Sequence, residues 1–168
     1  PRRAGIVRGM NETDRASRTL LIFDLDGTLY RTETSFLETM RRVYRVHGVP
    51  PPPDREIMAM VGETFGDFLA WLKPQGFKPS VEDLAERIAE IELAAIREQG
   101  QAYPGVLDTL RNLKSSGYRL AICTNGDARY AEAVLRAIGA WELFDAIKTF
   151  EDESRPKPAM VAELQAAF

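Results

Sequence analysis

The sequence predicts an α/β fold in which a parallel β-sheet core is interrupted by an inserted α-helical cap. Three short apolar runs, each followed by a polar turn, have the length and composition of buried strands. Segments with helical spacing of apolar residues separate the runs, and such alternation is typical of parallel sheets with right-handed crossovers. Residues 32–102, between the first two runs, show helical spacing and no strand signal, which predicts the cap.

The composition is that of an ordinary globular protein. Of the 168 residues, 45% are hydrophobic and 28% are charged, the net charge is −3 and the isoelectric point is about 5.3. An acidic chain without a long apolar run favours neither a nucleic-acid-binding nor a membrane-spanning protein. The single cysteine, Cys123, excludes an internal disulfide bond and is typical of a cytoplasmic protein. Residues 1–18 show no periodicity, and we expect a disordered leader there.

The first apolar run leads into two aspartates at alternate positions, within the segment Leu20–Leu29. We expect this run to form a strand that is buried on both faces of the sheet. Residues two apart in an extended segment point in the same direction, so Asp24 and Asp26 can present both carboxylates to one crevice. Two such carboxylates are costly unless a cation or a shared proton lies between them. Gly27 allows a sharp backbone turn directly after the pair.

Four helices are predicted in the cap. Gly48 fits the left-handed position that ends the first of them. Ser80 begins a sequence that resembles a capping box, with an aspartate in place of the usual glutamate. His47, the only histidine, lies on the apolar stripe of the first helix, where we expect it to pack or cap rather than to bind a ligand. The predicted helices cover Glu33–His47, Asp54–Val61, Gly66–Lys73 and Ser80 to about Gln99.

The chain returns to the core at Tyr103-Pro104-Gly105. A helix that stops at Gly117, a buried strand, a helix that stops at Gly139, a weaker third strand and a final helix follow in this order. Cys123 lies inside the second strand, where we expect it in the core. After this strand, the turn at residues 124–127 has helix-capping chemistry. The predicted segments are the strand Tyr118–Thr124, the helix Ala128–Ile138, the strand Ala146–Phe150, the loop Glu151–Pro158 and the helix Ala159–Phe168.

Polar side chains follow each of the three predicted strands. Asp24 and Asp26 follow the first strand, Thr124 and Asn125 end the second, and Lys157 lies in the loop after the third. The carboxyl ends of parallel strands lie at one edge of a sheet, so we expect these residues to converge. Each alone has an ordinary explanation, as an acidic turn, a helix cap or a solvated lysine. Together they predict an anion site, because a helix N-terminus favours phosphate and a lysine adds positive charge.

This ordered set resembles the haloacid dehalogenase superfamily of phosphohydrolases over residues 19–168. Asp24–Thr28 has the form Asp-x-Asp-Gly-Thr of the first signature, and Thr124 and Lys157 resemble the second and third. The resemblance is closest to the branch that includes phosphoglycolate phosphatases and β-phosphoglucomutases, whose helical cap follows the first signature. Tyr103–Val106 matches the usual re-entry from that cap. The resemblance implies a Rossmann-like core at residues 19–31 and 103–168 and a cap at residues 32–102.

The resemblance implies a magnesium-dependent phosphohydrolase that acts on a small phosphorylated metabolite. Asp24 would be the nucleophile and would become an aspartyl-phosphate. Asp26 would protonate the leaving oxygen and then deprotonate the attacking water. Asp24 would bind Mg²⁺ through its carboxylate and Asp26 through its backbone carbonyl. Thr124, Asn125 and Lys157 would bind the phosphate group.

Asp26 also separates this chemistry from that of the 2-haloacid dehalogenases. Those enzymes resemble this chain but have no acid at the position of Asp26, because carbon–halogen cleavage needs no protonated leaving oxygen. Dehalogenation is therefore a less favoured alternative, and a phosphoglucomutase-type phosphotransfer is a further one. Substrate specificity should lie in the cap, where Gly62 and Thr64 are candidates for a loop that faces the phosphate. Gly62 equally fits the end of a helix.

The chain ends at Phe168, before the superfamily's fourth signature, which follows another strand and adds acidic ligands to the magnesium site. Since the first strand is central in the family's sheet, this chain alone leaves that strand with an open edge, which favours aggregation. Three alternatives remain: truncation of an active phosphatase, which we favour; a partner chain that supplies the strand, by strand exchange or homo-oligomerisation; and a non-catalytic member that binds phosphate or a partner chain. We expect weak or no turnover from this chain alone.

Overall fold

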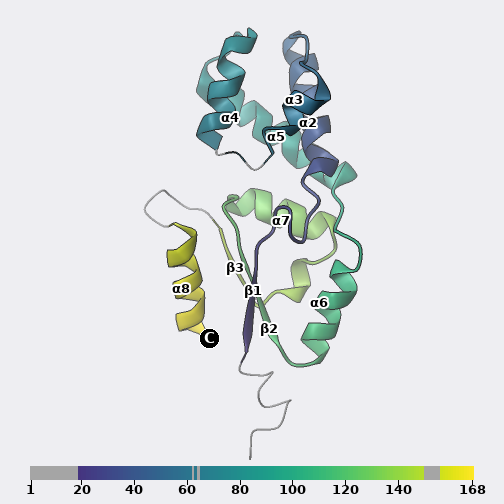
Figure 1. The fold of residues 1–168 in the computed structure, drawn as a ribbon, viewed down its shortest axis with the longest axis vertical. Helices are drawn as coiled ribbons and strands as arrows, with labels where there is room; N and C mark the ends of the chain where they lie inside the picture. The colour runs from purple at the N-terminus through teal and green to yellow at the C-terminus, as the bar shows by residue number, and fades with distance from the viewer. Residues whose placement is uncertain (1–18, 62, 64, 150–155) are drawn as a thin grey trace, which may run out of the picture.

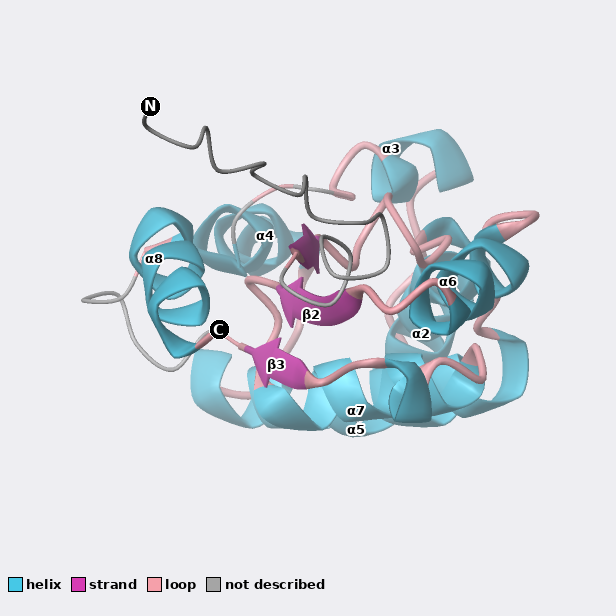
Figure 2. Ribbon diagram, turned by 90° about the horizontal axis from the view of Figure 1, so that it is seen from below, coloured by secondary structure: helices cyan, strands magenta, loops and turns pink. Residues whose placement is uncertain are grey.

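The computed structural model describes residues 19–61, 63, 65–149 and 156–168 (Figure 1). Its three strands are β1 (Leu20–Phe23), β2 (Arg119–Cys123) and β3 (Ala146–Lys148). They form one parallel sheet in the order β1-β2-β3, which confirms the predicted core (Figure 2). Phe23 pairs with Ile122, and Ile122 pairs with Ile147, so the carboxyl ends of the strands lie at one edge. The predicted leader and residues 151–155 of the predicted loop lie outside the described residues.

Helices cover both faces of the sheet. The core elements outside the sheet are α6 (Val106–Ser115), α7 (Ala128–Ala137), the short 3-10 helix η2 (Trp141–Leu143) and α8 (Lys157–Ala167). On one face, Met160 and Leu164 of α8 pack in a cluster with Cys123, which is buried as predicted. On the other face, Leu110 of α6 and Val134 of α7 belong to the main core cluster. Figure 1 shows α8 and α6 on opposite sides of the sheet.

The cap helices lie together beyond the carboxyl edge of the sheet (Figure 1). They are α2 (Glu33–His47), α3 (Asp54–Met58), α4 (Phe65–Leu72), the 3-10 helix η1 (Lys73–Gln75) and α5 (Val81–Gln99). Met40, Leu72 and Ile88 belong to a cluster that is separate from the core. α5 also reaches the core, because Leu93 and Ile96 belong to the main core cluster. The division into core and cap at residues 31–32 and 102–103 stays a prediction.

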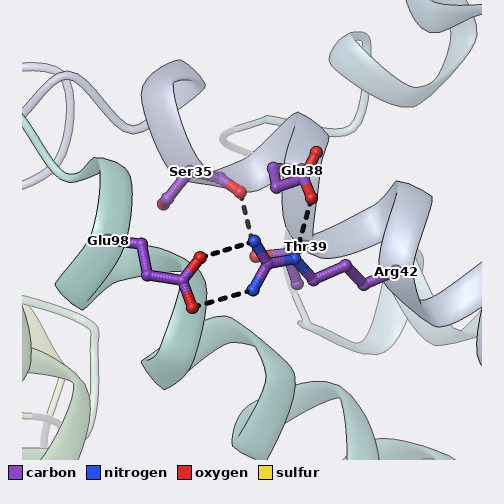
Figure 3. A network of polar contacts seen from close by, with 5 residues as sticks. All are labelled: Ser35, Glu38, Thr39, Arg42 and Glu98. Atoms are coloured by element: carbon purple, nitrogen blue, oxygen red, sulfur yellow. Dashed lines mark hydrogen bonds and ion pairs between the residues drawn. The ribbon is translucent and has the colours of Figure 1, made fainter.

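A charged network joins α2 to α5 (Figure 3). The Arg42 guanidinium donates to both carboxylate oxygens of Glu98, from Nη1 at 3.2 Å and from Nη2 at 2.6 Å, and its Nε donates to Glu38 at 2.8 Å. These hydrogen bonds raise the pKa of Arg42, and the bond to Glu98 contributes the most. In return, the hydrogen bond from Arg42 lowers the pKa of Glu98. One turn earlier in α2, Thr39 Oγ1 donates to the carbonyl oxygen of Ser35 at 2.9 Å. Arg42 thus connects the two long cap helices through a bidentate pair.

Helices with a capping signal begin or end where the sequence predicts. α2 has the predicted bounds and is followed by Gly48, whose φ of 65° lies in the left-handed region. α5 begins after Ser80, whose Oγ accepts from the amide of Asp83 at 3.1 Å. The rings of His47 and Phe77 pack in a T-shaped arrangement at a centroid distance of 5.5 Å, in agreement with the packing role predicted for His47.

The remaining cap helices differ slightly from the predicted bounds. α3 ends at Met58 rather than Val61, because the amides of Met60 and Val61 bind carbonyls three residues earlier, as in turns. α4 is displaced by one residue from the prediction, and Pro74 lies in the 3-10 helix that follows. β3 ends at Lys148, so Thr149 of the predicted strand lies outside it, and Phe150 lies outside the described residues.

Lys157 begins α8 and does not lie in a loop, which corrects the prediction that the final helix starts at Ala159. Pro156 immediately precedes the helix and Pro158 occupies its first turn. A proline is favourable there because its missing N–H would have no partner within the helix. Lys157 is therefore held by regular secondary structure at the end of the sheet.

In the described part of the chain, β1 lies at an edge of the sheet and pairs with β2 alone. The prediction that β1 is buried on both faces is wrong, since all four of its residues are only partly buried. By contrast, Leu120, Ala121 and Ile122 of the central strand have no exposed surface. The open edge expected for β1 is therefore present in these residues, and it accounts for the difference in burial. None of the described helices has the length and apolar character that crossing a membrane requires.

Candidate active site

The chain folds back on itself directly after β1. The carbonyl oxygen of Leu25 accepts hydrogen bonds from the amides of residues 28–30 at 3.0 to 3.3 Å. Gly27 has a φ of 66°, which a glycine adopts without a steric penalty, as the predicted turn requires. Since β1 ends at Phe23, Asp24 and Asp26 lie after the strand, in the segment that makes this turn.

Lys157 binds Asp24. Its Nζ lies 2.7 Å from Asp24 Oδ1, and the same oxygen accepts from the amide of Leu25 at 2.8 Å. The side chains of Asp24 and Lys157 are 41% and 33% exposed, so the pair is accessible to a ligand. Cys123 Sγ, at the end of β2, lies 3.9 Å from the carbonyl oxygen of Lys157. Burial raises the pKa of the Cys123 thiol and Lys157 opposes this effect, so the thiol remains protonated.

Asp26 has different partners from Asp24. Its Oδ1 accepts from Thr32 Oγ1 at 3.0 Å and from the phenol of Tyr130 at 2.5 Å. Thr32 directly precedes α2, and Tyr130 lies in the first turn of α7. Sequence reasoning identified neither hydroxyl, because a threonine before a helix and a tyrosine within one carry no signal of so distant a contact.

The turn after β2 is fixed by side-chain hydrogen bonds. Thr124 is 1% exposed, and its Oγ1 accepts from the amide of Gly126 at 3.1 Å. Asn125 is exposed. Asp127 caps α7 by accepting from the amide of Tyr130 at 2.8 Å, which confirms the predicted capping chemistry. The Gly126 amide, within the turn predicted to cap the helix, therefore donates to Thr124.

Glu92 of α5 lies beside the first turn of α7 and was not identified from the sequence. It lines a small cavity together with Asp127 and Tyr130. Burial, followed by the charges of Asp26 and Asp127, raises the pKa of Glu92 to about 7. Burial also raises the pKa of Tyr130 well above its usual value, and Asp26 and Glu92 add to this rise. The Tyr130 phenol therefore keeps its proton and acts as a hydrogen-bond donor.

The Asp24 carboxylate and the backbone carbonyl of Asp26 can contribute to a divalent metal site. Mg²⁺ is often bound through one or two carboxylates, while water and substrate phosphate complete its coordination. The accessible Asp24 carboxylate fits such a role. Among the described residues, no group of three or more Asp, Glu, His or Cys side chains forms a metal cage. Gly62 and Thr64, the predicted specificity residues of the cap, lie outside the described residues.

Several curated relatives of the chain are named as phosphatases. It is 34% identical over 152 residues to a protein named "Probable phosphatase IndB" from Dickeya dadantii, a match that covers 84% of this chain and 63% of the relative. It is 28% identical over 135 residues to a phosphoglycolate phosphatase from Caulobacter vibrioides, with 76% and 55% covered. The chain thus spans about three fifths of the length of these relatives.

A solved structure and a family model agree with these matches. CbbY from Rhodobacter sphaeroides, determined in complex with phosphate, superimposes with a TM-score of 0.69 at 28% identity, covering 86% of this chain and 69% of that one. The sequence model described as "Haloacid dehalogenase-like hydrolase" matches residues 21–165. This match covers most of the chain and includes Asp24, Thr124 and Lys157. The chain therefore belongs to the haloacid dehalogenase-like hydrolase family.

Proposed function

We propose that this chain is a magnesium-dependent phosphohydrolase that acts on a small phosphate monoester through an aspartyl-phosphate formed on Asp24. The observation that carries the proposal is the 2.7 Å contact between Asp24 and Lys157 at the carboxyl edge of the sheet. The pair offers a nucleophile and a fixed positive charge to the same anion. The relatives named phosphatases, and the phosphate in the CbbY structure, support the same chemistry.

Asp24 attacks phosphorus through Oδ2. Its Oδ1 is occupied by the Leu25 amide and the Lys157 ammonium group, and the described residues place no donor at Oδ2. A carboxylate can attack without a base to activate it, and phosphorylation then divides hydrolysis into two easier steps. The backbone amide and the lysine hold the carboxylate in a fixed orientation, which favours attack along a single line.

The phosphate group must be held against the charge of Asp24. Two like unit charges about 4 Å apart repel by about 4 kcal/mol at an effective dielectric constant of about 20. Lys157 offsets a repulsion of this size, since it lies directly beside Asp24. Thr124 and Asn125, at the turn that begins α7, complete the proposed phosphate site. Mg²⁺ bound by Asp24 and the backbone carbonyl of Asp26 would neutralise further phosphate charge.

Asp26 transfers the protons of both steps. It protonates the leaving oxygen as Asp24 attacks, and it then takes a proton from the water that attacks the aspartyl-phosphate. The cap supplies specificity for the part of the substrate beyond the phosphate, with Gly62 and Thr64 as its candidate residues. A homo-oligomer or strand exchange at the open edge of β1 belongs to the same proposal.

The test is magnesium-dependent release of phosphate from an aryl phosphate and from a small sugar phosphate. Residues 1–168 are assayed alone and within the longest polypeptide that the gene encodes. We expect Asp24→Asn to lower kcat by at least about 10³-fold, because a nucleophile has no substitute. Asp108→Asn, an exposed aspartate of α6 that pairs only with Arg111 among the described residues, is the matched control and should keep full activity.

The same assay separates the alternatives. Binding of inorganic phosphate without turnover, measured by calorimetry, would favour a non-catalytic member. Transfer of phosphate to a sugar acceptor would favour a phosphotransferase, and halide release from a 2-haloacid would favour a dehalogenase. Turnover that is equal in the unmodified protein and in Asp24→Asn would contradict the proposed nucleophile.

A further inference from the structure

Two hydroxyl groups donate to one oxygen of Asp26. Tyr130 lies 2.5 Å and Thr32 lies 3.0 Å from Oδ1, while the described residues offer no donor to Oδ2. A carboxylate oxygen that already accepts two hydrogen bonds is a poor site for a proton, because protonation would break at least one of them. A proton on Asp26 therefore belongs on Oδ2, the oxygen that no hydroxyl occupies.

The ring of Tyr130 is held from two directions. Its backbone amide donates to Asp127, which fixes the first turn of α7. Its ring lies against Gly126 so closely that a Cβ atom at that position would be 2.6 Å from the Cδ1 atom of Tyr130. Gly126 is therefore needed for the approach of the ring, which carries the phenol to Asp26.

We propose, given the function above, that Tyr130 is a positioning residue that directs Oδ2 of Asp26 toward the leaving oxygen of the substrate. As Asp24 forms its bond to phosphorus, the bond from phosphorus to the leaving oxygen breaks, and the Oδ2 proton moves to that oxygen. Asp26 then takes a proton from the water that attacks the aspartyl-phosphate. This second step releases inorganic phosphate and restores both aspartates. Tyr130 keeps its own proton throughout.

Leaving groups of different quality test this role. An alkyl phosphate such as glycerol phosphate needs a proton on its leaving oxygen, whereas 4-nitrophenyl phosphate has a leaving group that departs with little help. Tyr130→Phe keeps the ring and removes only the hydroxyl. Since general acid catalysis contributes about 10² to 10⁴-fold, we expect kcat to fall about 30-fold for the alkyl phosphate and about threefold for the aryl phosphate. KM should change little for either substrate, because the phenol touches Asp26 and not the phosphate site.

Tyr118→Phe is the matched control. Tyr118 is partly buried against the same core cluster, and its hydroxyl has no hydrogen bond among the described residues. Tyr118→Phe should leave kcat unchanged for both the alkyl and the aryl phosphate. A merely structural role of Tyr130 would lower both rates by the same factor, and that result would overturn the proposal.

A measurement without turnover tests the contact itself. Unfolding is compared for Tyr130→Phe, Asp26→Ala and the double variant. If the hydrogen bond forms, the unfolding equilibrium constant of the double variant should change by about threefold to tenfold less than the product of the two single fold-changes predicts. Additive effects would overturn the proposal. A complete lack of turnover in the unmodified protein overturns the proposed function and with it the positioning role, and this outcome differs from equal losses in an active protein.

Discussion

Replacing Glu92 with glutamine should remove most of a stability loss that we expect between pH 5 and pH 8. Glu92 lies on α5 and lines a cavity with Asp127, Arg129 and Tyr130 at the start of α7. Burial, followed by the charges of Asp26 and Asp127, raises its pKa from 4.5 to about 7. Arg129 is exposed to solvent, so its screened charge does little to oppose these effects.

The direction of the pH dependence follows from Glu92, which holds its proton more tightly in the folded state than in the unfolded state. Because the pKa of Glu92 is higher in the folded protein, its contribution to stability is fully present below about pH 4.5 and is lost as the pH rises through about 7. A pKa difference of about 2.5 corresponds to about 3 kcal/mol. Most of this difference falls between pH 5 and pH 8, because the pKa of the folded state lies within that range. Since Glu92 keeps some contact with solvent, we expect a measured loss of about 2 kcal/mol.

Urea unfolding at pH 5 and at pH 8 measures this difference. The unmodified protein and Glu86→Gln should each lose about 2 kcal/mol more than Glu92→Gln as the pH rises. Glu86 is the matched control, because it lies exposed on the same helix and makes no ion pair among the described residues. If Glu92→Gln shows the same pH dependence as the other two proteins, the reasoning from burial and from the two aspartates is refuted.

Two further substitutions test how the site and the cap are held. Gly126→Ala should lower the free energy of unfolding by about 1 to 3 kcal/mol, because the new Cβ would lie 2.6 Å from Tyr130 Cδ1. The same change in a Tyr130→Ala background should cost far less, and equal costs in urea unfolding would contradict the steric argument. Arg42→Lys should lower Tm, because a lysine cannot reproduce the bidentate pair with Glu98. The difference in Tm should shrink at high salt, and a difference unaffected by salt would argue against an electrostatic cause.

The parts of the fold that depend on neighbouring residues were predictable from the sequence. α2 has its predicted bounds because apolar spacing defines the helix and Gly48 ends it. The start of α5 was predictable because Ser80 supplies the capping oxygen. The parallel order of the strands followed from their alternation with helices. These signals act within a few residues, so they can be read without a structure.

The error at Lys157 has a local cause. The predicted loop extended through Pro158, yet proline is compatible with the first turn of a helix, and Lys157 begins α8. The error at β1 has a tertiary cause. An apolar run indicates that a strand is buried, but it does not say how many neighbouring strands cover it. In the described part of the chain, β1 has one such neighbour.

The surroundings of Asp26 were beyond sequence reasoning for a related reason. The Asp-x-Asp spacing predicted that both carboxylates can face one crevice, but it carried no signal of the different partners that Asp24 and Asp26 contact in the structure. The two donors to Asp26 come from separate elements, since Thr32 leads into the first cap helix and Tyr130 belongs to a core helix. The orientation of Asp26 therefore depends on the packing of both helices against the turn. The spacing of the two aspartates is visible in the sequence, but only the tertiary structure determines which oxygen of Asp26 accepts the two hydroxyl groups.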